Sequence, residues 1–166
     1  SGEIVLVIDS IIDQFWEIVK ERYSPQEISK IDSMADFGQL ILDRKEGGIS
    51  QEIVKKRTIC GGFTGNTGRG LGYLSLNPTL LGFFGTNRIE AEFNQLDQKC
   101  NLVSVGNPII CNILEFKDGK IMLPNLENLL NLNWKAIVEN TGYNKLKSIL
   151  KTNSMCLRGR LVPGNQ

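Results

Sequence analysis

The sequence predicts an α/β protein with an open, mostly parallel sheet that carries helices on its faces. Two short, all-apolar segments, residues 4–8 and 80–85, have the composition of strands buried on both sides. A third strand at residues 57–60 leads into a glycine-rich turn and a helical segment, and the strand at 80–85 then completes a βαβ pattern. With 41% hydrophobic residues, the 166 residues suffice for one core and are too few for two ordinary domains. We therefore expect a single domain over residues 1–166.

The first strand ends at polar residues. Residues 4–8 are all apolar, and Asp9-Ser10 follow directly. Asp13 comes just past this carboxyl end, which is where ligands bind in open α/β sheets. Residues 15–21 fit either a strand or the start of a helix. Residues 1–2, Ser-Gly without Met, are typical of the remnant of a cleaved expression tag, and we leave them out of the fold prediction.

Two helices are predicted in the next stretch. Ser24-Pro25-Gln26-Glu27 has an N-cap Ser, a Pro at the first helical position and a Glu at the third, so it predicts a helix start. A second helix is predicted over residues 34–44, where apolar residues form one stripe and Gly47-Gly48 end it. Residues 50–56 carry a weaker pattern and receive no assignment.

The glycine-rich turn after residue 60 leads into a predicted helix over residues 66–76. This helix contains three glycines, each of which costs about 1 kcal/mol relative to Ala in a helix interior. Because that cost needs a reason, we predict that the backbone of this helix approaches a neighbouring element closely. The three residues are Gly68, Gly70 and Gly72.

The second half of the chain continues the alternation of strands and helices. A β-hairpin is predicted around Lys117-Asp118-Gly119, because the Asp-Gly step is a strong turn signal between two apolar runs. Its strands are residues 109–116 and 120–123. The remaining predicted elements are a helix at 93–100, a strand at 102–105, helices at 134–139 and 144–151, and a final strand at 155–162.

Composition excludes several classes of function. The net charge is +1 without blocks of like charge, so neither nucleic acid nor a membrane surface is indicated as a partner. No apolar run reaches the ~20 residues of a membrane-spanning helix, and we expect a soluble, cytoplasmic protein. The chain has no His, which removes histidine-based nucleophile systems and imidazole metal sites. The four Cys form no C-x-x-C pair, so we expect free thiols and no metal site.

The stretch Gly61 to Gly70, read as GGFTGNTGRG, carries the most information about a site. It lacks the Gly-Lys-Ser/Thr ending of a phosphate loop, and its glycines do not fit the G-x-G-x-x-G spacing of a dinucleotide-binding fold. It is either a tight connection or a place where bare backbone lets a polar ligand approach a helix N-terminus. In the second case the Asn66 amide would offer a donor and an acceptor to a hydroxyl.

Together with the early Asp, this stretch resembles the ribokinase superfamily of sugar kinases, also called the phosphofructokinase-B family. In that family an early strand delivers an Asp and a G-G-x-x-x-N stretch opens a helix. The matching residues are Asp13, Gly61, Gly62 and Asn66. The resemblance covers most of the chain, from residue 4 to about 162, and implies a Rossmann-like, ribokinase-type sheet with flanking helices and a small β-hairpin lid.

The resemblance implies a role for each matched residue. Asp13 would accept hydrogen bonds from sugar hydroxyls, while Gly61, Gly62 and Asn66 would line the pocket. Asp9 is a rival for the role of Asp13, and Asp13 itself is open to interpretation as a helix N-cap or a solvated turn carboxylate. Residues 14–57 and 102–125 would be lid-type segments.

The chain also departs from the family pattern. Ile8 stands where the family usually has Gly, and residues 14–57 are longer than a minimal lid. The catalytic Gly-x-Gly-Asp of the family has no match in these residues, so we assign no catalytic residue, and we expect a truncated piece of a kinase. The family implies ATP or ADP with Mg²⁺ for the full-length enzyme and no cofactor in this chain.

The sequence therefore supports two functions. The first is the sugar-binding N-terminal portion of a carbohydrate kinase that transfers phosphate from a nucleotide to a sugar hydroxyl. The alternative is a non-catalytic α/β binding or dimerisation module, which would form a homodimer through the lid or an exposed sheet edge.

Overall fold

The computed structural model describes residues 4–150 and 155–158, which form two compact units. Unit 1 contains the described residues up to Ile12, residues 59–110 and the described residues from Asn125 onward. Unit 2 contains residues 13–58 and 111–124. The boundaries fall within four strands, which are β2 (Ile11–Arg22), β4 (Ile53–Gly61), β7 (Ile109–Glu115) and β8 (Lys120–Asn125).

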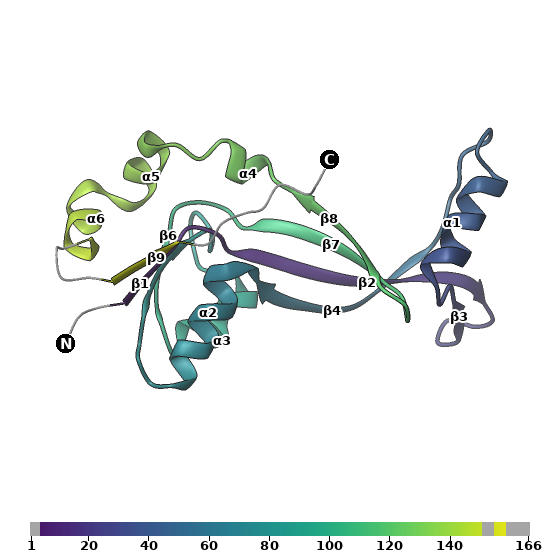
Figure 1. Cartoon of the computed structure of the whole chain (residues 1–166), viewed down its shortest axis with the longest axis horizontal. Helices are drawn as coiled ribbons and strands as arrows, with labels where there is room; N and C mark the ends of the chain where they lie inside the picture. The colour runs from purple at the N-terminus through teal and green to yellow at the C-terminus, as the bar shows by residue number, and fades with distance from the viewer. Residues whose placement is uncertain (1–3, 151–154, 159–166) are drawn as a thin grey trace. The chain divides into compact units, whose positions relative to one another are not determined.

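Unit 1 is built on a four-stranded sheet in the order β6-β5-β1-β9. Figure 1 labels β1, β6 and β9 of this sheet. Every neighbouring pair is parallel, with Leu6 opposite Leu80 and Leu80 opposite Leu102. The parallel α/β prediction is confirmed, although β1 and β5 end earlier than the apolar runs suggested. Residues 159–162 of the predicted final strand lie outside the described residues. The strands are β1 (Ile4–Val7), β5 (Thr79–Gly82), β6 (Asn101–Ser104) and β9 (Met155–Arg158).

Alternate residues of these strands face two separate cores, because successive strand side chains point to opposite faces. Val5 and Val7 pack with Leu146 and Ile149, and Leu6 packs with residues of the glycine-rich helix. Helices therefore cover both faces, as predicted for a parallel sheet. On one side lie α2 (Gly62–Tyr73), η1 (Ala91–Phe93) and α3 (Asn94–Asp97), and on the other α4 (Glu127–Leu130), α5 (Trp134–Thr141) and α6 (Tyr143–Ile149).

Close packing explains two of the three glycines in α2. A Cβ at Gly68 would lie 2.5 Å from Leu80 Cδ1, and one at Gly72 would lie 2.9 Å from Lys99 Cβ. The predicted close approach is confirmed at these positions. Gly70 is different, because a Cβ there would meet nothing within 4 Å.

Unit 2 holds most of the second sheet and one helix. The sheet runs in the order β3-β2-β7-β8, and β4 also pairs with β2. Its small core joins Ile18, Ile31 and Phe116 to Phe37 and Leu40 of the helix. The elements not yet introduced are β3 (Ile28–Lys30) and α1 (Met34–Asp43).

The hairpin turn of unit 2 caps the first helix. Phe116 N–H donates to the Gly119 carbonyl at 2.9 Å, which confirms the predicted hairpin. The Asp118 carboxylate of this turn accepts from Met34 N–H at 2.9 Å, while Ser33 Oγ accepts from Asp36 N–H at 3.0 Å. Two orphan donors at the start of α1 are thus satisfied, one by a residue 84 positions away in sequence.

The helix predicted to start at Ser24 is wrong. The Ser24 hydroxyl does accept from Glu27 N–H at 3.0 Å, but the chain turns and enters β3. The Arg22 guanidinium donates to the carbonyls of Ser24 and Pro25, at 3.0 and 2.9 Å. A helix starting at Ser24 would need these carbonyls as acceptors for its own backbone N–H groups. Because Arg22 binds them, the capping pattern closes a turn instead. Residues 15–21, left open between strand and helix, belong to β2, and β4 begins at Ile53.

Candidate functional site

Asp9 lies directly after β1 and holds the start of α2. Its side chain is buried, and Oδ1 accepts a hydrogen bond from Thr64 N–H at 2.9 Å. Thr64 stands in the first turn of α2, where backbone N–H groups have no partner inside the helix. A carboxylate at this end also opposes the positive end of the helix dipole. Asp9 therefore caps a helix whose N-cap residue, Gly61, has no side chain to do so.

Gly62 is required by the same arrangement. Its φ of 77° lies in the left-handed region that favours glycine, and a Cβ there would lie 3.2 Å from Asp9 Oδ1. Gly61 precedes it with an extended backbone. The start of α2 is consequently bare backbone, which allows a polar ligand to approach the N–H groups of the first turn.

Asn66 lies in the second turn of α2, because this helix begins four residues earlier than the sequence predicted. Its side chain is exposed and makes no hydrogen bond to the part of the chain that the structure describes. Asn66 thus does not open the helix, but its amide remains available to a ligand in solution.

Asp13 was expected just past the carboxyl end of the first strand, with a helix N-cap or a solvated turn carboxylate as alternatives. It is the third residue of β2 and belongs to unit 2. Its carboxylate is partly buried and accepts no hydrogen bond from the described residues. Burial raises the pKa of Asp13, and the nearby charge of Lys120 opposes that shift. Because Asp13 is neither at a helix start nor in a turn, the N-cap and turn interpretations are wrong.

Cys111 of β7 lies close enough to Asp13 for the charge of Asp13 to act on its thiol. Its side chain is buried, and burial, followed by the charge of Asp13, raises the pKa of the Cys111 thiol. Unit 2 therefore places a carboxylate, a thiol and the ammonium of Lys120 within electrostatic reach of one another. The sequence pattern gave no signal for this grouping, because the three residues come from three different strands.

Two buried hydroxyls beside the Asp9–α2 junction have no partner. Ser10 Oγ and Thr64 Oγ1 make no hydrogen bond to the described protein, although both residues are fully buried. Ser10 packs against Gly82, where a Cβ would clash with its hydroxyl. Buried polar atoms without a hydrogen-bond partner are uncommon. These two hydroxyls therefore indicate that function or packing constrains the residues at this junction. No motif in the sequence pointed to either residue.

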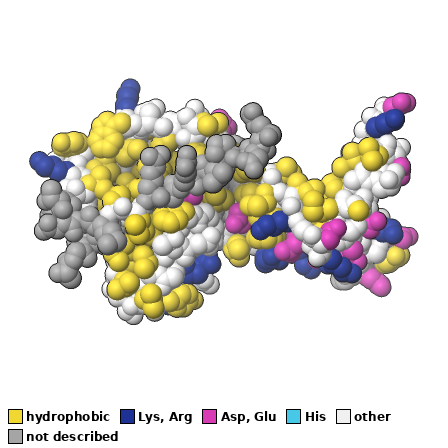
Figure 2. All heavy atoms as spheres, in the orientation of Figure 1, with side chains coloured by type: hydrophobic (Ala, Val, Ile, Leu, Met, Phe, Trp, Pro, Cys, Tyr) yellow, Lys and Arg dark blue, Asp and Glu magenta, His cyan; other side chains and the backbone are white. Residues whose placement is uncertain are grey.

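Several other acidic residues of unit 2 form ion pairs. Arg57 forms two hydrogen bonds with Glu115, at 2.6 and 2.7 Å, and Glu17 lies 2.7 Å from Lys30 and 3.3 Å from Lys56. Arg57 holds the pKa of Glu115 below its usual value. Figure 2 shows positive and negative side chains intermingled over the part of the chain that contains β3 and α1.

No acidic or thiol cluster of three or more that could hold a metal ion occurs within the described ranges. The four cysteines are free thiols; Cys60, Cys100 and Cys111 are buried and Cys156 is exposed. None of the helices in the described chain is both long and apolar enough to cross a bilayer.

Comparison with known proteins identifies relatives for nearly the whole chain. Residues 1–159 match the model of a protein family described as prokaryotic ketohexokinase. A ketohexokinase of Haloferax volcanii is 24% identical over 152 residues, which are 90% of this chain and 40% of that protein.

One solved structure gives the same result for the fold. A carbohydrate kinase from Agrobacterium tumefaciens matches with a TM-score of 0.56 and 13% identity, over 94% of this chain and 45% of that one. A Methanocaldococcus jannaschii nucleoside kinase of the ribokinase family has a TM-score of 0.44 and 16% identity, over 95% of this chain and 53% of that one. The predicted resemblance to the N-terminal part of ribokinase-like carbohydrate kinases is confirmed. The chain spans less than half the length of the ketohexokinase and the carbohydrate kinase that it matches.

Proposed function

Because the chain belongs to the prokaryotic ketohexokinase family, we propose that it is the sugar-binding part of a carbohydrate kinase and that its sugar is a ketohexose. The observation that supports this proposal is that the Asp13 carboxylate is partly buried and unpaired in the described protein. A partly buried carboxylate without a hydrogen-bond partner in the described protein has its full accepting capacity left for a ligand. Sugar hydroxyls are donors that suit it, since hydrogen bonds to a charged acceptor are among the stronger ones.

Hydrogen bonding distinguishes the two aspartates that are candidates for binding the sugar. Asp9 is occupied by Thr64 N–H at the start of α2, whereas Asp13 has no such partner. We therefore assign sugar-hydroxyl binding to Asp13 and a positioning role to Asp9. Gly61, Gly62 and Asn66 are proposed to bind further hydroxyls through backbone N–H groups and the exposed side-chain amide.

The whole protein is proposed to transfer phosphate from ATP or ADP, with Mg²⁺, to a hydroxyl of this sugar in the cytoplasm. The residues of this chain do not fit the nucleotide or the metal. They contain no Gly-x-Gly-Asp motif, and the described part offers no metal-binding group of acidic side chains. We therefore derive no phosphoryl-transfer step, and we propose for this chain sugar binding alone, with residues 14–57 and 102–125 as lid-type segments.

Isothermal titration of this chain with D-fructose tests the assignment. Asp13→Asn keeps the shape of the side chain but replaces a charged acceptor with a neutral amide, so we expect fructose affinity to fall by about tenfold or more. Asp36→Asn, which removes the same charge from an exposed position in the same unit, is the matched control and should bind as the wild type does. Equal fructose affinity in the Asp13 variant and in the wild type would refute the role of Asp13.

One observation also supports self-association of this chain. β8 stands at the end of the strand order β3-β2-β7-β8, and its side chains Met122 and Leu123 are 49% and 53% exposed. An edge strand with exposed apolar side chains is a template for pairing with another chain. We propose that two copies of this chain pair through β8.

A further inference from the structure

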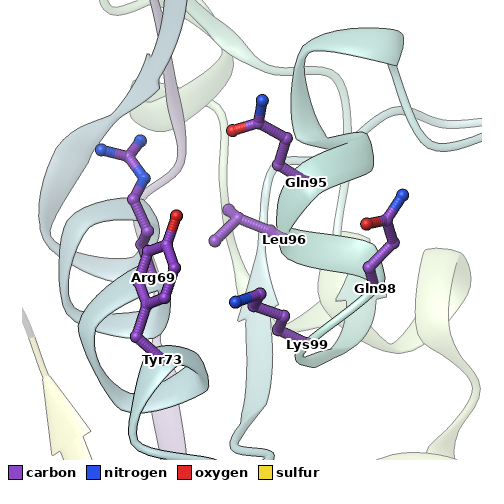
Figure 3. A pocket seen from close by; sticks show the side chains of 6 residues that line it. All are labelled: Arg69, Tyr73, Gln95, Leu96, Gln98 and Lys99. Carbon is purple, nitrogen blue, oxygen red and sulfur yellow. The ribbon is translucent and has the colours of Figure 1, made fainter.

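Unit 1 contains a surface cavity of about 260 Å³ between α2 and α3. Figure 3 shows Arg69 and Tyr73 reaching it from α2, opposite the side chains that come from α3 and the residues after it. None of the residues proposed to bind sugar lines this cavity. Its lining residues are Arg69, Tyr73, Gln95, Leu96, Gln98 and Lys99.

Every polar side chain that lines this cavity can donate a hydrogen bond, and two of them are cations. Arg69 and Lys99 form no ion pair with an acidic side chain in the described chain, and no carboxylate lines the cavity. The Gln95 and Gln98 amides and the Tyr73 hydroxyl also have no hydrogen bond to the described protein. In unit 2, by contrast, Arg57 is paired with a carboxylate. Two cations without counter-charge at one concave place favour an anionic ligand.

The two cations are held in position by the fold. Arg69 Nη2 donates to the carbonyl oxygen of Cys60 at 2.6 Å, which leaves Nε and Nη1 free for a ligand. The ammonium of Lys99 lies 3.7 Å from the centre of the Tyr73 ring, a cation–π contact that restrains its long side chain. A ligand would therefore meet donors that are already ordered, which lowers the entropic cost of binding.

We propose that this cavity binds a small phosphate monoester, at a site separate from the sugar-binding residues. The guanidinium of Arg69 and the ammonium of Lys99 would neutralise the phosphate dianion, and the two glutamine amides would donate further hydrogen bonds. Leu96, which is buried beneath the cavity, and the Tyr73 ring supply apolar contact for the organic part of the ligand.

Nuclear magnetic resonance titration of the ¹⁵N-labelled chain with phenyl phosphate tests this proposal. Phenyl phosphate is a monoester without sugar hydroxyls, so the result does not depend on the proposed sugar site. We expect saturable shifts of the backbone signals at residues 69–73 and 95–99, weakened by added NaCl because the site is open to solvent.

Two variants locate the binding site without removing the anchored Arg69. Lys99→Gln removes one cation, and Gln98→Glu places a carboxylate at an exposed position on the rim; each should weaken phenyl phosphate binding by about tenfold. Lys145→Gln removes an exposed lysine of α6 in the same unit and should leave the affinity unchanged, as should Asp13→Asn. The proposal is overturned if no saturable shifts occur, if they map elsewhere, or if both rim variants bind as tightly as the wild type.

Discussion

At the scale of single residues, the structure separates two aspartates that stand four positions apart in sequence. Asp9 is buried and hydrogen-bonded to the backbone of α2, so it contributes to the fold. Asp13 is partly buried and has no hydrogen-bond partner in the described chain, so its charge is a cost to the fold. Residues retained at such a cost are often found at binding sites.

This difference predicts how Asp13→Asn changes stability. Burial raises the folded-state pKa of Asp13 above its ordinary value of 3.8, so the folded chain loses stability as the pH rises from 3.8 through the raised pKa. The variant should therefore be more stable than the wild type at pH 7, by up to about 1 kcal/mol because solvent screens a partly exposed group. Near pH 3, where Asp13 is protonated in both states, the charge-dependent part of this difference should vanish.

Urea unfolding of both proteins at pH 7 and pH 3 measures this effect. Asp36→Asn, at an exposed position in the same unit, serves as the control for the loss of one negative charge. If Asp13→Asn were less stable than the wild type at pH 7, the carboxylate would have a stabilising partner in the fold, contrary to our account.

At the scale of elements, the glycines of α2 provide a matched pair of substitutions. Gly68→Ala would drive a methyl group against the buried Leu80 and should lower the free energy of unfolding by about 1–3 kcal/mol. Gly70→Ala meets open space and should raise it by about 1 kcal/mol through better helix propensity. Denaturant unfolding distinguishes the two, and equal effects of both substitutions would contradict the packing of α2 on β5.

The elements that could be predicted from sequence are those specified by local pattern. The apolar runs of β1 and β5, the stripe of α1 and the Asp-Gly turn between β7 and β8 each have a period or a turn residue that fixes them. The pattern at Ser24 failed because Arg22 binds the carbonyls that a helix would have used. The short elements β3 and α4 were not predicted, because neither has an all-apolar run like those of β1 and β5.

At the scale of the whole molecule, the parallel α/β sheet and its family could be predicted, but the roles of the site residues could not. Asp9 meets Thr64 across 55 positions of sequence, and no local signal records that contact. The family motif pointed to Asp13, Gly61, Gly62 and Asn66. Only the three-dimensional structure shows that the side chain of Asp9, and not that of Asp13, is hydrogen-bonded to another part of the described fold. The division into two units also arises from contacts that are distant in sequence.

Self-association through β8 is a property of the whole molecule and predicts a concentration-dependent size. Sedimentation velocity should show dimers of the wild type, and the double substitution Met122→Lys and Leu123→Glu should shift the equilibrium toward monomer by at least about tenfold. Tyr143→Lys, which changes an exposed aromatic residue of α6, is the control for a lost apolar side chain. A wild type that stays monomeric at all concentrations would refute pairing through β8.

The central claim is that this chain binds a ketohexose by itself, and the most direct measurement is its thermal unfolding in the presence of a panel of sugars and nucleosides. We expect D-fructose, without nucleotide, to raise the unfolding temperature in proportion to the logarithm of its concentration once binding saturates. Aldohexoses and nucleosides should raise it less at the same concentration. An unfolding temperature that no sugar in the panel changes, in a chain that unfolds cooperatively, would contradict the claim.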